Sequence, residues 1–135
     1  MQLEKRASTQ TEQEAGTSAT VLVTPARQQY HPSSAKAWIY FDGTGTPAIH
    51  ASYNVSSLSD NAVGNYSVNF TVAFSSQNYC AVGSSRAGGG SQNITTCNRD
   101  SALSASSFNV YTVNPSTPGT LQDDTDNRIT FFGDQ

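Results

Sequence analysis

The chain has 135 residues, a formal net charge of −3 and 13% charged residues. This length suits a single domain with one hydrophobic core, and the scarcity of basic residues disfavours nucleic acid as a partner, because proteins that bind phosphate backbones cluster Lys and Arg. Abundant Ser, Thr, Asn and Gly disfavour helix, whereas the Val, Tyr, Phe and Thr residues suit strands.

The first 36 residues are polar and are predicted to form an N-terminal arm and connector (residues 1–36). A helix over residues 3–15 is weak, because its length is close to the limit for isolated helicity. Pro25 stops a short apolar run, and residues 26–36 are expected to be an extended connector. The side chains expected to contact another copy of the chain or another protein are Val21, Leu22, Val23, Tyr30, His31 and Trp38.

Residues 1–6 lack the hydrophobic segment of a secretory signal. No apolar run approaches the roughly 20 residues that a membrane-spanning helix requires. We therefore expect the chain to be made in the cytosol, with no membrane insertion.

A dense strand pattern begins at Ala37. Residues 37–41 form a strand-like run that ends at the strong turn signal of residues 42–47. The next run covers residues 48–58, and its alternation falters near residues 52–56, which predicts a bulge or two shorter strands. Asp60 to Gly64 then closes a hairpin.

The return strand of this hairpin has the clearest alternation in the sequence. Apolar side chains from Tyr66 to Phe74 alternate with polar ones, so one face of the strand is expected to be buried and the other to face solvent. The apolar members are Tyr66, Val68, Phe70, Val72 and Phe74.

Four further strands are expected in the C-terminal half. Residues 78–86 and 93–100 flank a glycine-rich tip, as the two strands of a hairpin would, and residues 106–114 and 128–132 follow. Seven or eight short strands with regular turns predict an all-β, antiparallel, jelly-roll-like β-sandwich over residues 37–135, in preference to a closed barrel.

The midpoint between Cys80 and Cys97 falls within the glycine-rich tip, Gly88 to Gly90. In a simple hairpin they would lie opposite each other or nearly so, close enough for a disulfide. A reducing cytosol favours the alternative of two free, buried thiols. The chain has no Cys-x-x-Cys motif, which disfavours redox catalysis.

Closely spaced carboxylates in Asp123, Asp124 and Asp126 resemble a loose calcium loop. The glycine and the distal glutamate of the full signature are absent, which favours an ordinary solvated acidic turn. His31 and His50 are the two histidines, and neither has a Cys or a second His at ligand spacing. We expect no metal, no cofactor and no enzyme activity.

Trp38 starts the folded body directly after the connector. Aromatic rings are enriched in the cores of protein interfaces, so Trp38 is expected to be buried between protomers. The alternative is that exposed rings such as Trp38 and Tyr30 stack on sugars.

Residues 24–38, with Tyr30-His31-Pro32 leading to Trp38, resemble a module of tailed-phage and prophage tail-fibre and related virion proteins. Residues 41–46 and 51–57 extend the similarity, which spans roughly residues 9–74. The resemblance implies a homotrimeric β module that mediates attachment within a particle or to a host surface.

These observations favour a non-enzymatic phage virion protein, a short trimeric tail fibre, spike or tip module assembled in the host cytoplasm. Its expected partners are two further copies, other virion proteins bound through the arm, and host-surface polysaccharide. A capsid decoration or head-fibre protein is one alternative. A virion-associated glycan hydrolase is another, and it would need a pair of acidic side chains.

Overall fold

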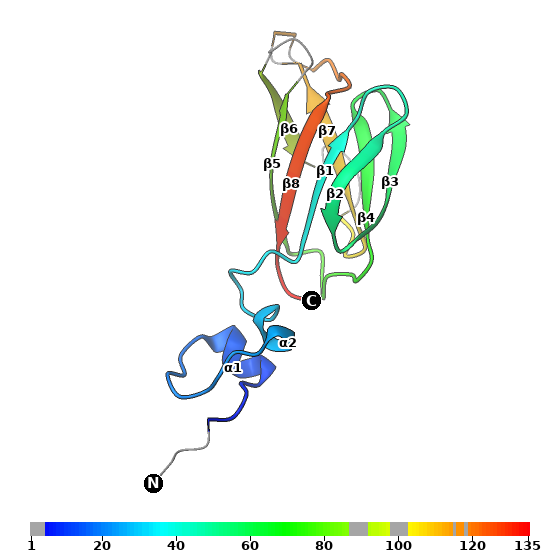
Figure 1. Cartoon of the computed structure of the whole chain (residues 1–135). Helices are drawn as coiled ribbons and strands as arrows, with labels where there is room; N and C mark the ends of the chain where they lie inside the picture. The colour runs from blue at the N-terminus through cyan, green and yellow to red at the C-terminus, as the bar shows by residue number, and fades with distance from the viewer. Residues whose placement is uncertain (1–4, 87–91, 98–102, 115, 118) are drawn as a thin grey trace.

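The computed structural model describes residues 5–86, 92–97, 103–114, 116–117 and 119–135, with residues 92–97 described by their backbone alone. Within these residues the chain forms two short helices and eight strands (Figure 1). In chain order they are α1 (Gln10–Ala15), α2 (Pro25–Gln28), β1 (Ala37–Asp42), β2 (Ala48–Tyr53), β3 (Val55–Ala62), β4 (Asn65–Phe70), β5 (Cys80–Arg86), β6 (Gln92–Cys97), β7 (Ser107–Val113) and β8 (Asp126–Phe132).

The strands form two antiparallel sheets that face each other (Figure 1). They are hydrogen-bonded in the order β2-β1-β8-β5-β6-β7-β4-β3. Strands β5 and β6 pair at Ser85↔Asn93 and Arg86↔Gln92, where the chain passes from one sheet to the other. The order β8-β5-β6-β7 is that of a Greek key. The predicted all-β, antiparallel sandwich is confirmed.

The hydrophobic core lies between the two sheets. Strands β1, β4, β7 and β8 alternate between buried and less buried side chains, so each contributes one apolar face. Aromatic rings fill the end of the core nearer the chain termini, where they meet edge to face. The buried apolar residues are Ala37, Ile39, Phe41, Tyr66, Val68, Phe70, Phe74, Phe108, Val110, Ile129 and Phe131.

The sequence predicted either a bulge or two shorter strands over residues 48–58. The structure has two strands, β2 and β3, divided at Asn54. Its backbone is left-handed (φ 54°), a conformation that Asn tolerates better than most residues. Its side-chain Oδ1 accepts a hydrogen bond from the Val72 backbone N–H (2.7 Å). Val72 was expected in the core, and this is wrong, because β4 ends at Phe70 and Val72 is 58% exposed.

Strand β2 is an edge strand with every residue exposed. It pairs with β1, and a register shift at Tyr40 and Phe41 leaves His50 as the extra residue of a bulge. The His50 ring lies 4.7 Å from the Tyr40 ring. The outer face of this sheet therefore carries aromatic side chains.

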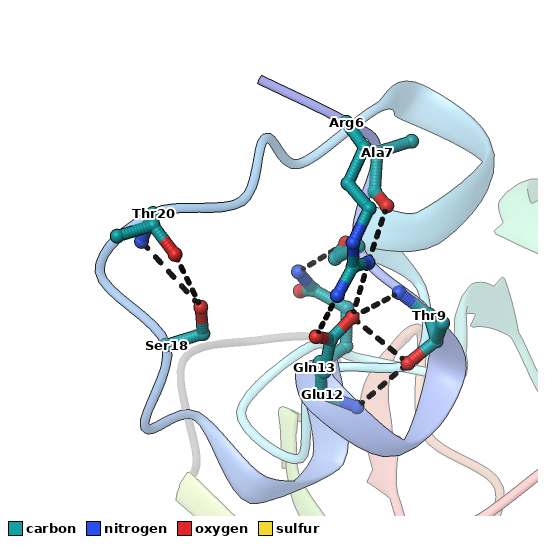
Figure 2. A network of polar contacts seen from close by, with 8 residues as sticks. Arg6, Ala7, Thr9, Glu12, Gln13, Ser18 and Thr20 are labelled. Carbon is teal, nitrogen blue, oxygen red and sulfur yellow. Dashed lines mark hydrogen bonds and ion pairs between the residues drawn. The ribbon is translucent and has the colours of Figure 1, made fainter. Parts of the chain in front are cut away.

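The N-terminal unit, residues 5–36, begins with a capped helix (Figure 2). Thr9 Oγ1 accepts a hydrogen bond from the Glu12 backbone N–H (3.3 Å), and the Glu12 carboxylate accepts one from the Thr9 N–H (2.8 Å). This reciprocal capping box satisfies backbone donors at the start of α1. Gly16, at φ 63°, ends the helix in the left-handed conformation that glycine adopts readily.

The first part of the N-terminal unit, residues 6–22, is held together by hydrogen bonds within itself. Arg6 pairs with the Glu12 carboxylate through both terminal guanidinium nitrogens. The Ser8 N–H donates to the Leu22 carbonyl (2.8 Å), and the Leu22 N–H donates to the Arg6 carbonyl (2.9 Å). Buried Gln13 donates from Nε2 to Ser8 Oγ (2.8 Å). This part of the predicted arm is folded.

The predicted extended connector over residues 26–36 is also wrong. Pro25 stands in the first turn of α2, where its missing N–H costs nothing. Turns follow the helix: the His31 N–H donates to the Gln28 carbonyl (3.2 Å), and the Ser34 N–H donates to the His31 carbonyl (2.9 Å). These local hydrogen bonds shorten the segment.

Acid is expected to break the capping network of α1. The hydrogen bond from Arg6, aided by those from Thr9, lowers the pKa of Glu12 from 4.5 to about 2. Because the folded-state pKa lies below the unfolded value, the network stabilises α1 above about pH 4.5 and loses this contribution as the pH falls through about 2. A carboxyl NMR titration of Glu12 should show a midpoint near pH 2.

The matched variant for this titration is Arg6→Ala. It should shift the midpoint of Glu12 upward toward 4.5, because the first cause of the lowered pKa is the Arg6 hydrogen bond. The same midpoint in both proteins would contradict the ion pair between Arg6 and Glu12.

Lys36 joins the N-terminal unit to the sandwich. Its side chain is buried and donates from Nζ to the carbonyls of Gln29 and His31, which follow α2. Its backbone N–H donates to the Phe131 carbonyl of β8 (2.8 Å). Burial lowers the pKa of Lys36. The ammonium group therefore anchors the turns after α2 against the end of β8.

Candidate functional site

An open groove lies between the N-terminal unit and the edge of the sandwich. It consists of two neighbouring hollows of about 530 and 640 Å³, which is within the range of ligand sites. Tyr53 and Gln29 line both hollows and stand between them. We call this the junction groove, and its lining residues are Pro25, Gln28, Gln29, Tyr30, Ser33, Ser34, Ala35, Trp38, Tyr53, Asn54, Thr71, Val72 and Gln135.

Trp38 and Tyr53 form the aromatic wall of the junction groove. They are directly opposite each other in the β1–β2 pair, and opposed residues of antiparallel strands project from the same face. Trp38 is 39% exposed and Tyr53 is 49% exposed. Two large rings therefore stand side by side at the groove with much of their surface open to solvent.

Amide and hydroxyl groups form the opposite wall. Gln28 ends α2, Gln29 follows it as the C-cap, and Ser33 and Ser34 lie in the turns beyond. Ser34 Oγ donates to the Gln28 carbonyl (2.9 Å), and Gln29 Nε2 donates to the Ala26 carbonyl (3.3 Å). These short-range contacts hold the polar wall in place against the rings.

The floor near β2 is hydrogen-bonded to the sandwich. Asn54 Nδ2 donates to the carbonyls of Lys36 and Val72, at 3.0 Å in each case. Gln135 Nε2 donates to the same Val72 carbonyl (2.9 Å). Asn54 therefore holds the β2–β3 corner next to the joint formed by Lys36.

A charged network occupies the same outer face, away from the groove. Asp126 Oδ1 accepts from the Tyr40 hydroxyl (2.7 Å), and Oδ2 accepts from Arg86 Nε (2.8 Å). Arg128 also contacts Asp126 (3.3 Å) and stacks over the Tyr40 ring at 4.5 Å. The Tyr40 hydroxyl and then Arg86 lower the pKa of Asp126, and the same carboxylate raises the pKa of Tyr40.

A second carboxylate, Asp123, closes the opposite end of the core. Its Oδ1 accepts from the Tyr66 hydroxyl (2.6 Å) and from the Gly64 N–H (2.7 Å). The Tyr66 hydroxyl is also 2.9 Å from the Gly43 carbonyl. Burial and the Asp123 hydrogen bond raise the pKa of Tyr66 far above 10. Asp123 thus acts as a structural acceptor.

The prediction that residues 123–126 form a solvated acidic turn is therefore wrong, because these carboxylates are not solvated. Asp124 and Asp126 are buried, and Gln122 Nε2 donates to Asp124 Oδ1 (2.9 Å). The donors to Asp123 and Asp126 come from segments far away in the sequence, and local sequence cannot reveal such contacts. Among the described residues, no three His, Cys, Asp or Glu side chains gather as metal ligands.

The predicted contact residues separate into two places. Val21, Leu22 and Val23 lie between α1 and α2, with Val21 half-buried and the other two exposed. Tyr30 and Trp38 line the junction groove instead. Contact of these residues with another copy of the chain or another protein remains a prediction.

His31 is the remaining predicted contact residue. It is exposed, and its ring Nδ1 lies 2.6 Å from the Ser33 hydroxyl. The Ser33 backbone N–H also donates to this nitrogen (3.2 Å). His31 therefore helps to shape the turn after α2, beside the polar wall of the groove.

Cys80 is a free, exposed thiol, which corrects the expectation that it is buried. It pairs with Phe132 of β8, whereas Cys97 pairs through its backbone with Val110 of β7. The side chain of Cys97 lies outside the described residues, as do the glycine-rich tip and residues 98–102.

Sequence reasoning missed Tyr53, Gln28 and Gln29 in the groove, and Arg86 and Arg128 on the outer face. The only signal for Tyr53 was its place in an alternating run. Its position beside Trp38 depends on the β1–β2 register and bulge, which nothing in the local sequence specifies.

Comparison of the chain with protein-family models, curated proteins and solved structures finds no match. The resemblance to phage fibre modules therefore remains a prediction from the residues that carry it. None of the helices in the described part of the chain is long and apolar enough to span a membrane.

Proposed function

We propose that this chain is a non-enzymatic structural module of a bacteriophage particle, a short trimeric fibre, spike or tip that attaches the particle to a surface. The resemblance of residues 24–38 to tail-fibre modules supports this proposal. The architecture is compatible with it, because a β-sandwich carries a separate N-terminal unit at one end (Figure 1).

The observation that carries the proposal is the apolar surface of the N-terminal unit. Leu22 is 47% exposed and Val23 is 57% exposed, although the backbone of Leu22 is held by hydrogen bonds to Arg6 and Ser8. Adjacent apolar side chains on an ordered backbone favour contact with another protein surface. Three copies related by symmetry would bury these side chains against one another or against a shared partner.

Glycan hydrolysis is not part of the proposal. It requires two carboxyl groups that flank the substrate, one of them protonated. Asp126 is held ionised by Tyr40 and Arg86, and Asp123 is held by Tyr66 and Gly64. Both carboxylates are used to stabilise the sandwich.

The double variant Leu22→Ser/Val23→Ser is expected to convert a trimer into monomers. Size-exclusion chromatography with light scattering should give the mass of three protomers for the parent and of one for the variant at the same concentration. The exposed positions of both side chains should leave the fold intact, which far-UV circular dichroism checks.

Val63→Ser is the control, because Val63 is 60% exposed and lies in the β3–β4 turn of the sandwich. It should remain trimeric. A parent protein that is monomeric at every concentration would contradict the proposal. Electron microscopy of phage particles labelled with a gold-conjugated antibody against this protein distinguishes a position on the tail from one on the capsid. No labelling on any particle would overturn the virion role.

A further inference from the structure

We infer that the junction groove binds a neutral polysaccharide, with the Trp38 and Tyr53 rings as stacking platforms. This inference rests on the proposed attachment function and names the class of surface molecule that the chain would contact. Four features of the groove favour such a ligand: its two rings, its unpaired polar groups, its open shape, and a lining that contains no charged side chain among the described residues.

The two rings suit the apolar face of a sugar. A pyranose ring presents a patch of C–H groups with slight positive charge, which the negative face of an aromatic ring attracts. Trp38 and Tyr53 are opposed across β1 and β2 and both remain partly exposed. Because both residues stand on paired strands, no backbone segment has to become ordered when a sugar binds.

Polar groups with no protein partner surround these rings. Within the described residues, no hydrogen bond engages Trp38 Nε1, the Tyr53 hydroxyl, the Tyr30 hydroxyl or the Gln28 side-chain amide. Together they offer donors and acceptors that match sugar hydroxyl groups, each of which both donates and accepts.

No charged side chain lines either hollow among the described residues. Two charged side chains of the neighbouring segment make other contacts: Lys36 is buried against backbone carbonyls, and Arg27 lies over the Tyr30 ring at 5.8 Å. An acidic polysaccharide would instead need the arginines near Asp126, which face solvent farther along the sheet. The groove therefore favours an uncharged sugar chain.

The groove is open rather than enclosed, and its two hollows adjoin along Tyr53 and Gln29. An open trough admits an internal segment of a long chain, whereas a closed pocket would accept only a chain end. Each site would bind weakly. Three sites per trimer and many trimers per particle would then supply the avidity that surface attachment requires.

Trp38 is the only tryptophan of the chain, so its fluorescence reports on the groove directly. The first measurement is acrylamide quenching of the intact oligomer without sugar. Trp38 is expected to be accessible. A ring shielded from acrylamide before any sugar is added would mean that another protomer covers the groove, and it would overturn the inference.

The second measurement titrates the oligomer with neutral glucans, mannans, galactans and N-acetylhexosamine oligomers, with polysialic acid as the acidic comparison. At least one neutral chain should shift the Trp38 emission and protect it from acrylamide. No response to any neutral chain, or a response to the acidic chain alone, would overturn the inference.

Tyr53→Ala tests the second ring while it leaves the Trp38 reporter in place. It should weaken the binding of the responding sugar about three- to tenfold, the usual value of one aromatic contact. Gln28→Ala should weaken it as well. Val63→Ala, an exposed apolar change in the β3–β4 turn, should leave the affinity unchanged, and equal weakening by all three variants would contradict a site at the groove.

Failure of this inference is separable from failure of the proposed function. Leu22→Ser/Val23→Ser should lose the trimer but keep the affinity of each protomer for a short neutral oligosaccharide. If the protein is a trimer but binds no neutral sugar, this inference fails while the proposed attachment module is retained.

Discussion

Phe131→Ala is expected to lower the free energy of unfolding by about 3–5 kcal/mol, the largest loss from any single core substitution that we propose. Phe131 is fully buried on β8. Its ring meets Phe70 at 5.0 Å and Phe108 at 5.1 Å, both edge to face. The substitution removes an entire ring from between the two sheets and leaves a cavity that close-packed neighbours cannot fill.

Urea denaturation of both proteins measures this effect. A loss of this size is a large part of the roughly 5–15 kcal/mol that keeps a typical domain folded, so the variant should unfold at a much lower urea concentration. If the variant is too unstable to purify, Phe131→Leu provides a milder version with the same sign.

Phe132→Ala is the matched control for Phe131→Ala. It removes the same atoms from the next residue of β8, whose side chain is only half-buried and points to the opposite face. The expected loss is about 1 kcal/mol, in proportion to the smaller area that it removes from water. Equal losses at both positions would show that Phe131 is not the residue of this pair that faces the core.

Gly64→Ala is expected to cost about 3–4 kcal/mol, because it combines two separate penalties. Gly64 has a left-handed backbone (φ 61°) in the β3–β4 turn. A Cβ there would lie 2.7 Å from the Gln122 nitrogen and 2.9 Å from the Thr112 carbonyl oxygen. Since both are backbone atoms, the approach cannot be relieved by rotating a side chain.

The close approach at Gly64 also positions a hydrogen bond. The Gly64 N–H donates to Asp123 Oδ1, and this carboxylate in turn accepts from the Tyr66 hydroxyl. If the segment at Gln122 moves away, Tyr66 is left buried beside a displaced partner, which adds to the cost. Loss of the Tyr66 hydroxyl signal or its rapid exchange in NMR spectra would accompany the fall in stability.

Gly45→Ala separates the two penalties. Gly45 has almost the same backbone conformation (φ 62°), but nothing lies within 4 Å of the position of its Cβ. Only the left-handed strain applies, so the expected loss is roughly 1–2 kcal/mol. Thermal or urea unfolding measures both losses. If Gly45→Ala lowers the free energy of unfolding as much as Gly64→Ala does, the contact of Gly64 with Gln122 is not tight.

The shape of the junction groove depends on the joint between the N-terminal unit and β8. The polar wall comes from α2 and its following turns, and the aromatic wall comes from β1 and β2. Buried Lys36 holds the turns through the carbonyls of Gln29 and His31. Any change that releases Lys36 should therefore displace the polar wall of the groove.

Local pattern in the sequence was enough to predict the sandwich class and most of its strands. Alternation of apolar and polar residues placed Tyr66, Val68 and Phe70 on one buried face, and glycine and proline signals placed the turns around β1 and β2. These properties depend on neighbouring residues along one strand, because a pleated strand sends successive side chains to opposite faces.

Only the tertiary structure decided which distant residues meet. The β1–β2 register set Tyr53 beside Trp38, and strands β5 and β8 brought Arg86 to Asp126. Backbone hydrogen bonds of Leu22 with Arg6 and Ser8 folded the segment that the sequence presented as an extended arm. Such contacts depend on how strands pair and where turns close, and the free energy that selects them comes from burial across the whole chain. A local pattern therefore predicted the core face, whereas the groove required the assembled fold.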